Sequence, residues 1–193
     1  TTMPLTPSLS PKAPSVAAVS YLLLDYNTNT VLAEKNSTLQ VEPASLTKML
    51  TVFIVDNEIR NGKIKPTDEV TISKHAWQTQ GSRMFVQVGT KVKVEDLVKG
   101  VIIQSGNDAS IALAEHIAGS EESFAELMNA YAKHLGMNDS HFTDATGWPD
   151  ENHYTSAYDL ALLARAMIHE FPPELYAIHS EKWFFYNGIK QPN

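Results

Sequence analysis

Hydrophobic residues recur along this chain with two periods, one typical of strands and one typical of helices. Short apolar runs bounded by turn-forming residues predict strands at 15–24, 31–35, 69–72 and 183–186, and we expect the first of them to be buried. Apolar residues at helical spacing predict a long helix that carries Ser45 and ends near Asn61 and Gly62. Further helices are expected at 94–103, 109–114, 122–135 and 155–168.

Two stretches of the chain show neither period. Residues 73–92 are expected to be mostly loop, and a loop of this length in a compact domain is often functional. Residues 139–154 are also expected to be loop. The helix after them should begin at a cap formed by Ser156 and Asp159, which are three residues apart.

The two ends of the chain differ from its middle. Prolines and little charge make residues 1–14 an extended leader to a domain at 15–193. The leader lacks the apolar core of a signal peptide, so we expect that a signal has already been removed. Near the other end, Asn187 and Gly188 predict a tight hairpin turn, and we expect the returning strand to be incomplete because sequence is missing.

The composition is that of an ordinary globular protein, and it excludes several kinds of chemistry. The chain has 193 residues, of which 43% are hydrophobic and 19% charged, and its net charge is −7. An acidic chain without a basic stripe cannot neutralise phosphates, which argues against nucleic acid as a partner. The absence of cysteine excludes disulfides, thiol catalysis and cysteine-based metal sites. No apolar run approaches the roughly 20 residues that a membrane helix needs.

Ser45 and Lys48 are candidate catalytic residues at the start of the long helix. A separation of three residues places two side chains on one helix face. A serine hydroxyl becomes an effective nucleophile when a nearby base takes its proton, and a lysine can serve if its pKa is lowered by burial or by another cation. The helix start also favours developing negative charge. The ordinary alternative is a helix-capping serine followed by a surface lysine.

A second polar motif, Ser105-Gly106-Asn107, interrupts two apolar helices. It places polar side chains inside the protein, where such groups need hydrogen-bond partners. The alternative is a turn capped by Asn107 or Asp108.

The histidines argue against a metalloenzyme. They form neither a His-x-x-x-His pair nor a His-Glu-x-x-His motif, and we expect most of them to be surface or capping groups. The seven are His75, His116, His134, His141, His153, His169 and His179.

The two motifs together resemble those of the penicilloyl-serine transferases, which include penicillin-binding proteins and serine β-lactamases. The chain is most similar to low-molecular-mass penicillin-binding proteins of the D-alanyl-D-alanine carboxypeptidase type, the penicillin-binding protein 5/6 group. The resemblance extends over nearly all of the chain after about Ala13. The segments that carry it are Pro43-Ala44-Ser45-Leu46-Thr47-Lys48-Met49, Gln104-Ser105-Gly106-Asn107-Asp108-Ala109, Gly136-Met137-Asn138-Asp139-Ser140-His141-Phe142 and Tyr154-Thr155-Ser156-Ala157-Tyr158-Asp159-Leu160.

The resemblance implies a fold and a set of residue roles. The fold would be the α+β fold of DD-peptidases and β-lactamases, with a helical cluster packed on an antiparallel sheet whose later strands lie beyond Asn193. Ser45 would be the acylated nucleophile, its N–H would supply half of an oxyanion hole, and Lys48 would be the general base. Ser105 would relay a proton to the leaving group, and Asn107 would hydrogen-bond both the substrate backbone and Lys48.

Three further residues are implied to bind substrate without reacting. They are Gly106, Gly147 and Trp148, the last two in a loop that edges the site. For Trp148 the alternative is an ordinary packing role.

One departure from the family pattern is serious. Family members carry a Lys-Thr-Gly or Lys-Ser-Gly motif on a strand beside the nucleophile, which supplies a second lysine and the other oxyanion N–H. No such motif occurs here, because Lys190 is followed by Gln191 and Pro192. We expect it in a C-terminal remainder of the same protein, and we expect residues 1–193 expressed alone to fold poorly and not to bind penicillin.

The implied function is that of a serine-type carboxypeptidase acting on peptidoglycan. The enzyme would remove the last D-alanine from stem peptides that end in D-Ala-D-Ala, without a metal or cofactor, and β-lactams would acylate the same serine. It would work as a monomer on the outer face of a bacterial cytoplasmic membrane, attached only through a C-terminal anchor that this chain lacks.

Two other functions compete with this one. A class A β-lactamase would have Ser-Asp-Asn where this chain has Ser105-Gly106-Asn107, and it would need a Glu-x-x-Leu-Asn loop that is absent. A non-catalytic module that binds the cell wall would explain the missing third motif but not the two intact ones.

Overall fold

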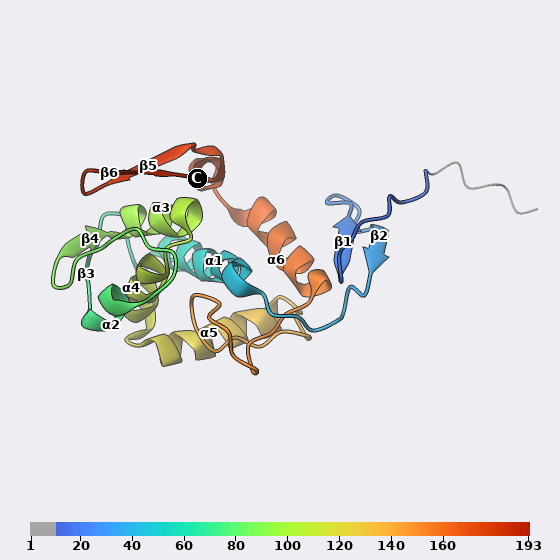
Figure 1. Cartoon of the computed structure of the whole chain (residues 1–193), viewed down its shortest axis with the longest axis horizontal. Coiled ribbons are helices and arrows are strands. Elements are labelled where there is room, and N and C mark those ends of the chain that lie inside the picture. Colours follow the sequence, from blue (N-terminus) through green and yellow to red (C-terminus); the bar gives the residue numbers. More distant parts are fainter. Residues whose placement is uncertain (1–10) are drawn as a thin grey trace, which may run out of the picture.

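A single central helix organises the part of the chain that the computed structural model describes, residues 11–193. Helix α1 (Thr47–Arg60) contacts α3, α4, α5 and α6, and these helices surround it in Figure 1. Ten of its fourteen residues are buried, so the helix is enclosed on nearly all sides, as expected for a core helix. Its direction therefore fixes where its first turn, with Lys48, meets the rest of the molecule.

The elements follow the chain in an irregular order of helices and short strands. The strands are β1 (Tyr21–Leu24), β2 (Val31–Lys35), β3 (Glu69–Thr71), β4 (Lys91–Lys93), β5 (Trp183–Tyr186) and β6 (Ile189–Pro192). The helices besides α1 are η1 (Ala44–Leu46), α2 (Lys74–Gln78), α3 (Val94–Gln104), α4 (Asn107–Ala118), α5 (Glu121–His134), α6 (Ala157–Glu170), α7 (Pro173–Ala177) and η2 (Ile178–Ser180).

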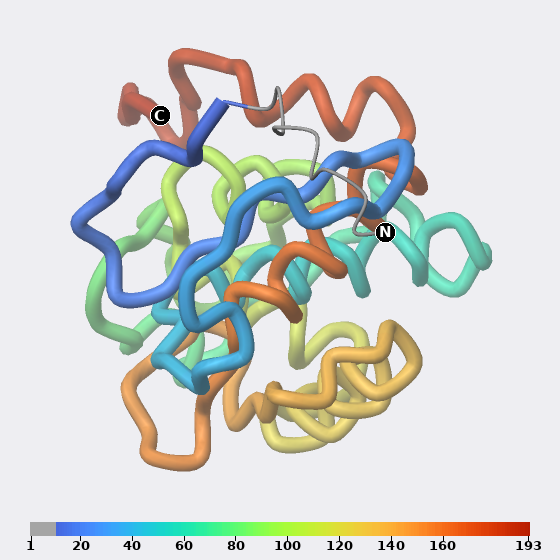
Figure 2. Tube along the Cα trace, turned by 90° about the vertical axis from the view of Figure 1, so that its right-hand side faces the viewer, coloured from blue at the N-terminus to red at the C-terminus, as the bar shows by residue number. Residues whose placement is uncertain are grey.

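The strands of residues 11–193 pair as three separate antiparallel hairpins, β1 with β2, β3 with β4, and β5 with β6. The last hairpin packs on α3, and the first lies against α6 on the other side of the helices (Figure 1). In Figure 2, α5 and the loop after it lie along one side of the molecule and the C-terminal segment along the opposite side, with the central helices between them.

Most of the helices expected from the sequence are confirmed, with their caps. Ser156 Oγ accepts a hydrogen bond from the N–H of Asp159 at 3.1 Å, as the spacing of the two residues predicts. Helix α1 ends at Asn61, and the left-handed Gly136 follows the end of α5. Helix caps of this kind can be predicted from the sequence because the capping residue and its partner lie within one turn of each other.

The first strand is shorter and more exposed than expected. Only Tyr21–Leu24 forms a strand, and Val19 and Leu23 are 69% and 56% exposed. The prediction of a buried strand at 15–24 is therefore wrong. The reason is that the hairpin meets the helices chiefly where β1 contacts α6, which leaves much of its surface without a covering layer. Of the expected leader, residues 1–10 lie outside the described residues, and 11–14 have no regular structure.

Two short elements were missed in the stretch expected to be mostly loop. Helix α2 begins at Ser73, whose Oγ accepts from the N–H of Ala76 at 3.0 Å, and β4 pairs with β3. A helix of five residues and a strand of three are too short to show a period in the sequence.

The hairpin near the end of the chain has the predicted turn. Asn187 and Gly188 both have positive φ, 47° and 75°, which is the backbone of a two-residue hairpin turn. The returning strand was expected to be incomplete, and that is wrong, because all four residues of β6 pair with β5. Among residues 11–193, no helix has both the length and the apolar character needed to cross a membrane.

Asp108 fixes the path of the long loop between α2 and β4. The carboxylate is 1% exposed and accepts hydrogen bonds from the N–H groups of Met84, Phe85 and Val86 at 2.9–3.1 Å. Phe85 has φ of 68°, a left-handed conformation that is strained for a residue with a side chain. The buried carboxylate therefore holds a strained turn that no regular structure supports, rather than capping the turn before α4.

We expect Asp108→Asn to destabilise the protein, because the amide can accept at one oxygen where the carboxylate accepts at two. Hydrogen bonds to a charged group are worth about 1.5–3 kcal/mol each, so the free energy of unfolding should fall by about 2–4 kcal/mol. Urea unfolding of the full-length protein measures this. Glu126→Gln, which neutralises an exposed carboxylate on α5, is the matched control and should change stability by less than about 0.5 kcal/mol. Equal unfolding midpoints for the two variants would contradict the role given to Asp108.

Candidate active site

Ser45 lies in a tight turn immediately before the central helix. It is the middle residue of η1, and the sequence had placed it within the long helix itself. The turn closes by a hydrogen bond from the N–H of Leu46 to the carbonyl of Pro43, at 3.1 Å. Ala44 has φ of 48°, so the backbone just before Ser45 is in a strained left-handed conformation. The result is an exposed hydroxyl presented at the start of a buried helix.

Lys48 is buried in the first turn of α1 and faces Ser45. Lys48 is only 4% exposed. Its Nζ donates to Ser45 Oγ at 3.2 Å and to the carbonyl of Thr146 at 2.9 Å. Burial lowers the pKa of Lys48 from 10.5 to about 8, against the opposing charge of Asp144, which raises it. A lysine with this pKa is neutral in a useful fraction of molecules near pH 7 to 8. In its neutral form, Nζ can accept the proton of the Ser45 hydroxyl through the same contact.

Ser105 ends α3 in a left-handed conformation, with φ of 51° and ψ of 38°. Its Oγ is buried and, within residues 11–193, has no hydrogen-bond partner. A buried hydroxyl without a partner carries a cost of about 1–3 kcal/mol, and a strained backbone adds to it. Both features are typical of a residue kept for function rather than for stability.

Asn107 is the first residue of α4, and the loop that follows α2 accepts two hydrogen bonds from it. Its Nδ2 donates to the carbonyl of Gln80 at 2.8 Å, and its N–H donates to the carbonyl of Ser82 at 2.7 Å. The expected hydrogen bond to Lys48 is not formed: Asn107 Nδ2 donates to Gln80, and the two hydrogen bonds of Lys48 Nζ go to Ser45 and Thr146. The structure therefore joins Ser45 to Lys48 directly, but it joins Ser105 and Asn107 to neither of them by a hydrogen bond.

Gly106 provides a close approach between backbones. A Cβ there would lie 3.0 Å from Asp108 Oδ1, 3.2 Å from the carbonyl of Gly100 and 3.3 Å from the N–H nitrogen of Met84. These short distances explain why residue 106 is a glycine, because a side chain would collide with its neighbours. They leave its expected contact with substrate a prediction.

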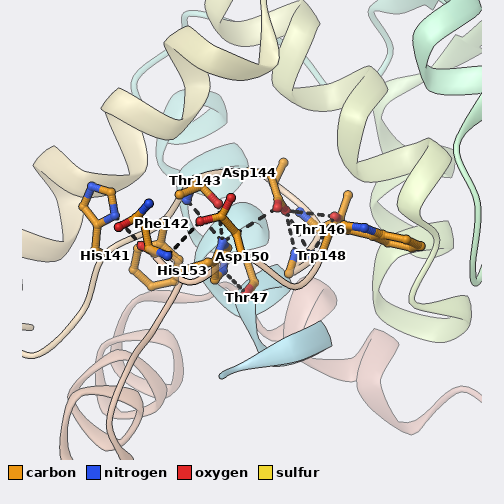
Figure 3. A network of polar contacts seen from close by, with 12 residues as sticks. Thr47, His141, Phe142, Thr143, Asp144, Thr146, Trp148, Asp150 and His153 are labelled. Atoms are coloured by element: carbon orange, nitrogen blue, oxygen red, sulfur yellow. Dashed lines mark hydrogen bonds and ion pairs between the residues drawn. The ribbon is translucent and has the colours of Figure 1, made fainter. Parts of the chain in front are cut away.

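The loop between α5 and α6 supplies the carbonyl that holds Lys48, and Asp144 shapes it. Asp144 Oδ1 accepts from the N–H groups of Thr146 and Gly147, both at 2.7 Å, and from the Thr146 hydroxyl at 2.8 Å (Figure 3). This side chain closes a turn on its own backbone, as aspartate often does. The turn points the Thr146 carbonyl at α1.

Gly147 fits against the turn that carries Ser45. It has φ of 86°, and a Cβ there would lie 1.7 Å from the carbonyl oxygen of Ala44 and 2.8 Å from Thr47 Oγ1. No side chain can occupy this position without moving the loop or the Ser45 turn. The close approach is a physical reason for glycine at this position, whereas the expected contact of Gly147 with substrate stays a prediction.

Trp148 is 52% exposed, so it is not a core residue. It forms one wall of a shallow pocket of about 260 Å³ with His75, Gln78, Thr79 and Gln80. A Cβ added to Gly81 would lie 2.8 Å from Asn107 Nδ2 and 3.7 Å from the Trp148 ring, which shows how near the two side chains are. The ring therefore borders the entrance to the site beside Asn107.

Sequence reasoning missed the residues that join the loop to α1. Besides Asp144 and Thr146, they are Thr47, Thr51 and His153. Thr51 Oγ1 donates to the carbonyl of Ala145 at 2.9 Å, and Thr47 Oγ1 contacts His153 Nε2 at 2.8 Å (Figure 3). Most of the histidines are exposed, as expected, and His153, at 2% exposed, is the exception. Only the Asp-x-Thr-Gly run could have indicated a turn here. Within residues 11–193, no three potential ligands among His, Cys, Asp and Glu are grouped to hold a metal ion.

Comparison with known proteins places this geometry in a family. The family model described as D-alanyl-D-alanine carboxypeptidase (Peptidase_S11) matches residues 8–193. The curated relatives include D-alanyl-D-alanine carboxypeptidase DacC of Escherichia coli K12, 50% identical over 188 residues, which are 94% of this chain and 47% of that protein. DacA of the same organism is 43% identical over 192 residues, 96% of this chain and 47% of that protein. The chain thus spans about half the length of the curated relatives it matches.

Solved structures give the same result for the fold. Penicillin binding protein 5 from Haemophilus influenzae superposes with a TM-score of 0.92 at 44% identity, covering 95% of this chain and 54% of that one. Penicillin binding protein 6B from Escherichia coli gives 0.91 at 43% identity, covering 96% and 60%. The predicted α+β fold of the DD-peptidases is confirmed over the part that this chain covers.

The close fit of Gly147 against Ala44 leads to a prediction about stability. Gly147→Ala adds a methyl group that overlaps the Ala44 carbonyl, in a backbone conformation that already disfavours alanine. We expect the free energy of unfolding of the full-length protein to fall by at least about 3 kcal/mol, measured by thermal or urea unfolding.

Gly62→Ala is the matched control. Gly62 has φ of 71° but nothing within 4 Å of the added Cβ, so it tests the backbone strain without the overlap. We expect it to cost only about 1 kcal/mol. Similar losses for the two variants would show that the loop gives way and does not hold the Ser45 turn.

Proposed function

Because the chain belongs to the D-alanyl-D-alanine carboxypeptidase family, we propose that the protein is a serine-type D-Ala-D-Ala carboxypeptidase with Ser45 as its nucleophile. One observation carries the assignment of residues. The 3.2 Å contact between Lys48 Nζ and Ser45 Oγ joins a base whose pKa burial lowers to about 8 with an exposed hydroxyl. No other Ser–Lys pair of residues 11–193 is joined by a hydrogen bond.

The proposed reaction is acyl transfer from the peptide bond between two D-alanines. Ser45 Oγ attacks the carbonyl carbon while its proton passes to Lys48 Nζ, and the C–N bond then breaks. The leaving amine takes a proton and departs as free D-alanine. Water then attacks the acyl-enzyme ester, which returns Ser45 to its hydroxyl form and releases the shortened peptide. Each step is a proton transfer or a nucleophilic substitution, so no oxidant, metal or cofactor is required.

The other residues of the candidate site have supporting roles in this proposal. The Ser45 N–H would stabilise the developing oxyanion, since it lies at the start of α1 where N–H groups are free. Ser105 would pass the proton to the leaving amine, and its unpartnered buried Oγ supports that role. Asn107 would present Oδ1 to a substrate N–H, because its Nδ2 is bound to Gln80. Trp148 would border the bound peptide, and Gly106 would line its path.

The proposal includes partners and a location that go beyond the described residues. We propose that a Lys-Thr-Gly segment, which does not occur among these 193 residues, completes the oxyanion hole and supplies a second cation. β-Lactams would acylate Ser45 as covalent inhibitors. Peptidoglycan lies outside the bacterial cytoplasmic membrane, so the protein would act on the outer face of that membrane.

The test is covalent labelling of the full-length protein with benzylpenicillin. We expect intact mass to increase by one penicilloyl group, and peptide mapping to place that group on Ser45, because among the serines of residues 11–193 only Ser45 has a buried lysine hydrogen-bonded to its hydroxyl. Ser45→Ala should show no increase in mass.

Labelling on any other serine would contradict the assignment of the nucleophile. A protein that remains unlabelled at saturating penicillin would instead favour a non-catalytic module that binds the cell wall. Rapid loss of the label by hydrolysis would favour a β-lactamase.

The second test concerns Lys48 as the base. Lys48→Arg keeps a positive charge that cannot be lost near neutral pH, so acylation should slow by at least about 10³-fold, equivalent to roughly 4 kcal/mol at the barrier. Lys133→Arg, an exposed change on α5, should acylate at the wild-type rate.

The dependence of the acylation rate on pH tests whether Lys48 must be neutral to take the proton. The pKa of Lys48 is lowered to about 8, so most molecules carry the charged form at pH 7 and the neutral form at pH 9. The wild-type rate should therefore rise with pH through about 8, and this limb should vanish in Lys48→Arg. A wild-type rate that is flat from pH 6 to 9 would mean that another group takes the proton.

A further inference from the structure

His153 is the one buried histidine of residues 11–193, and it lies against the first turn of α1 rather than in the reacting centre. It belongs to the loop between α5 and α6, and Figure 3 shows its ring between that loop and Thr47. The ring of Phe142 packs edge-on against it at 5.5 Å between centroids. Every polar atom of the imidazole therefore has a defined neighbour.

The neighbours of the ring identify its protonation state. Nδ1 lies 3.2 Å from the N–H of Thr143, and because an N–H can only donate, Nδ1 must accept. The Thr143 hydroxyl lies 3.0 Å from the same nitrogen and can also donate to it. The remaining proton is then on Nε2, which donates to Thr47 Oγ1 at 2.8 Å.

The charged groups around the ring are consistent with a neutral His153. Burial lowers the pKa of His153, which opposes protonation, while Asp144 and Asp150 act in the other direction and His141 in the same one. Asp144 Oδ2 lies 3.7 Å from Nδ1, beyond a normal hydrogen bond, and the nearer Thr143 N–H holds the nitrogen as an acceptor.

Thr47 is where the loop meets the catalytic helix. It lies between Ser45 and Lys48, it is fully buried, and its hydroxyl accepts the Nε2–H of His153. The same loop also receives hydrogen bonds from the α1 face at two carbonyls, from Lys48 to Thr146 and from Thr51 to Ala145. Of these three links, only the one from His153 donates from the loop to the helix. It is also the only one of the three that ends on a residue between Ser45 and Lys48.

We propose that neutral His153 is a positioning residue, which holds Ser45 and Lys48 at their working separation by donating a hydrogen bond to Thr47. It does not contact either reacting side chain, and it acts through the backbone of the residue between them. This inference rests on the proposed acylation of Ser45. Small displacements of a nucleophile from its base can cost up to about 10² in rate, so the effect of losing this link should be measurable.

Two substitutions of His153 separate positioning from general stability. His153→Gln places an amide N–H near the position of Nε2 and keeps the donor to Thr47, but it loses the acceptor for Thr143. His153→Asn keeps an acceptor near the position of Nδ1 and loses the donor to Thr47. His153→Gln removes the acceptor for the N–H and the hydroxyl of Thr143, and His153→Asn removes the donor to Thr47, so both should lower the unfolding temperature of the full-length protein.

The two variants should differ in their rate of acylation by benzylpenicillin. We would measure this rate in the full-length protein by rapid-quench kinetics. His153→Asn should lower the first-order acylation constant at saturating penicillin by about 10- to 100-fold, with the dissociation constant of the initial complex unchanged. His153→Gln should stay within about threefold of the wild type. Thr47→Val, which removes the acceptor without changing the shape, should match His153→Asn, and the double variant should lose no more than either alone.

The outcomes separate the two levels of inference. If wild-type Ser45 is labelled but His153→Asn and Thr47→Val acylate at the wild-type rate, the role given to His153 is wrong and the proposed function stands. Losses that multiply in the double variant, or a Gln variant as slow as the Asn variant, would reduce His153 to a structural residue. A wild type that penicillin does not label overturns both.

Discussion

A lysine that serves as a base must be buried enough to lose its proton and still be held beside the nucleophile. Lys48 meets both demands because α1 runs through the middle of the helical cluster and brings its first turn into the interior. Burial lowers its pKa to about 8, and the carbonyl of Thr146 and the charge of Asp144 keep the ammonium form from becoming too costly. The pKa of the proposed base is thus set by burial, which lowers it, and by a small number of nearby dipoles and charges, which oppose that effect.

The loop between α5 and α6 supplies the Thr146 carbonyl and the Asp144 charge beside Lys48, and its own contacts hold it in one conformation. Asp144 closes the turn on its own backbone, and Gly147 lets the turn lie against Ala44 at a distance that no side chain would allow. Helix α1 and the loop exchange hydrogen bonds in both directions, through Lys48 from the helix and His153 from the loop. Preorganised groups of this kind need not rearrange during a reaction, which is why they contribute to catalysis.

Strain is concentrated where the chain passes the candidate site. Ala44, Phe85 and Ser105 all have positive φ, which costs energy for residues with side chains. Asp108 offsets the strain at Phe85 with three backbone hydrogen bonds, whereas Ser105 Oγ has no partner among residues 11–193. The first arrangement holds a loop in place. The second leaves a polar atom free for chemistry, which fits the proposed proton relay.

The sequence by itself determined the features whose causes lie within a few residues. The caps of α6, the hairpin turn at Asn187 and the Ser45–Lys48 spacing are of this kind, because one turn of backbone brings their partners together. The tertiary structure decided which distant groups meet. His153 and Thr47 are 106 residues apart, and Asn107 donates to the carbonyl of Gln80, 27 residues away. Such pairings depend on how helices pack and which face of a hairpin is covered, and no local pattern of hydrophobic and polar residues encodes that geometry.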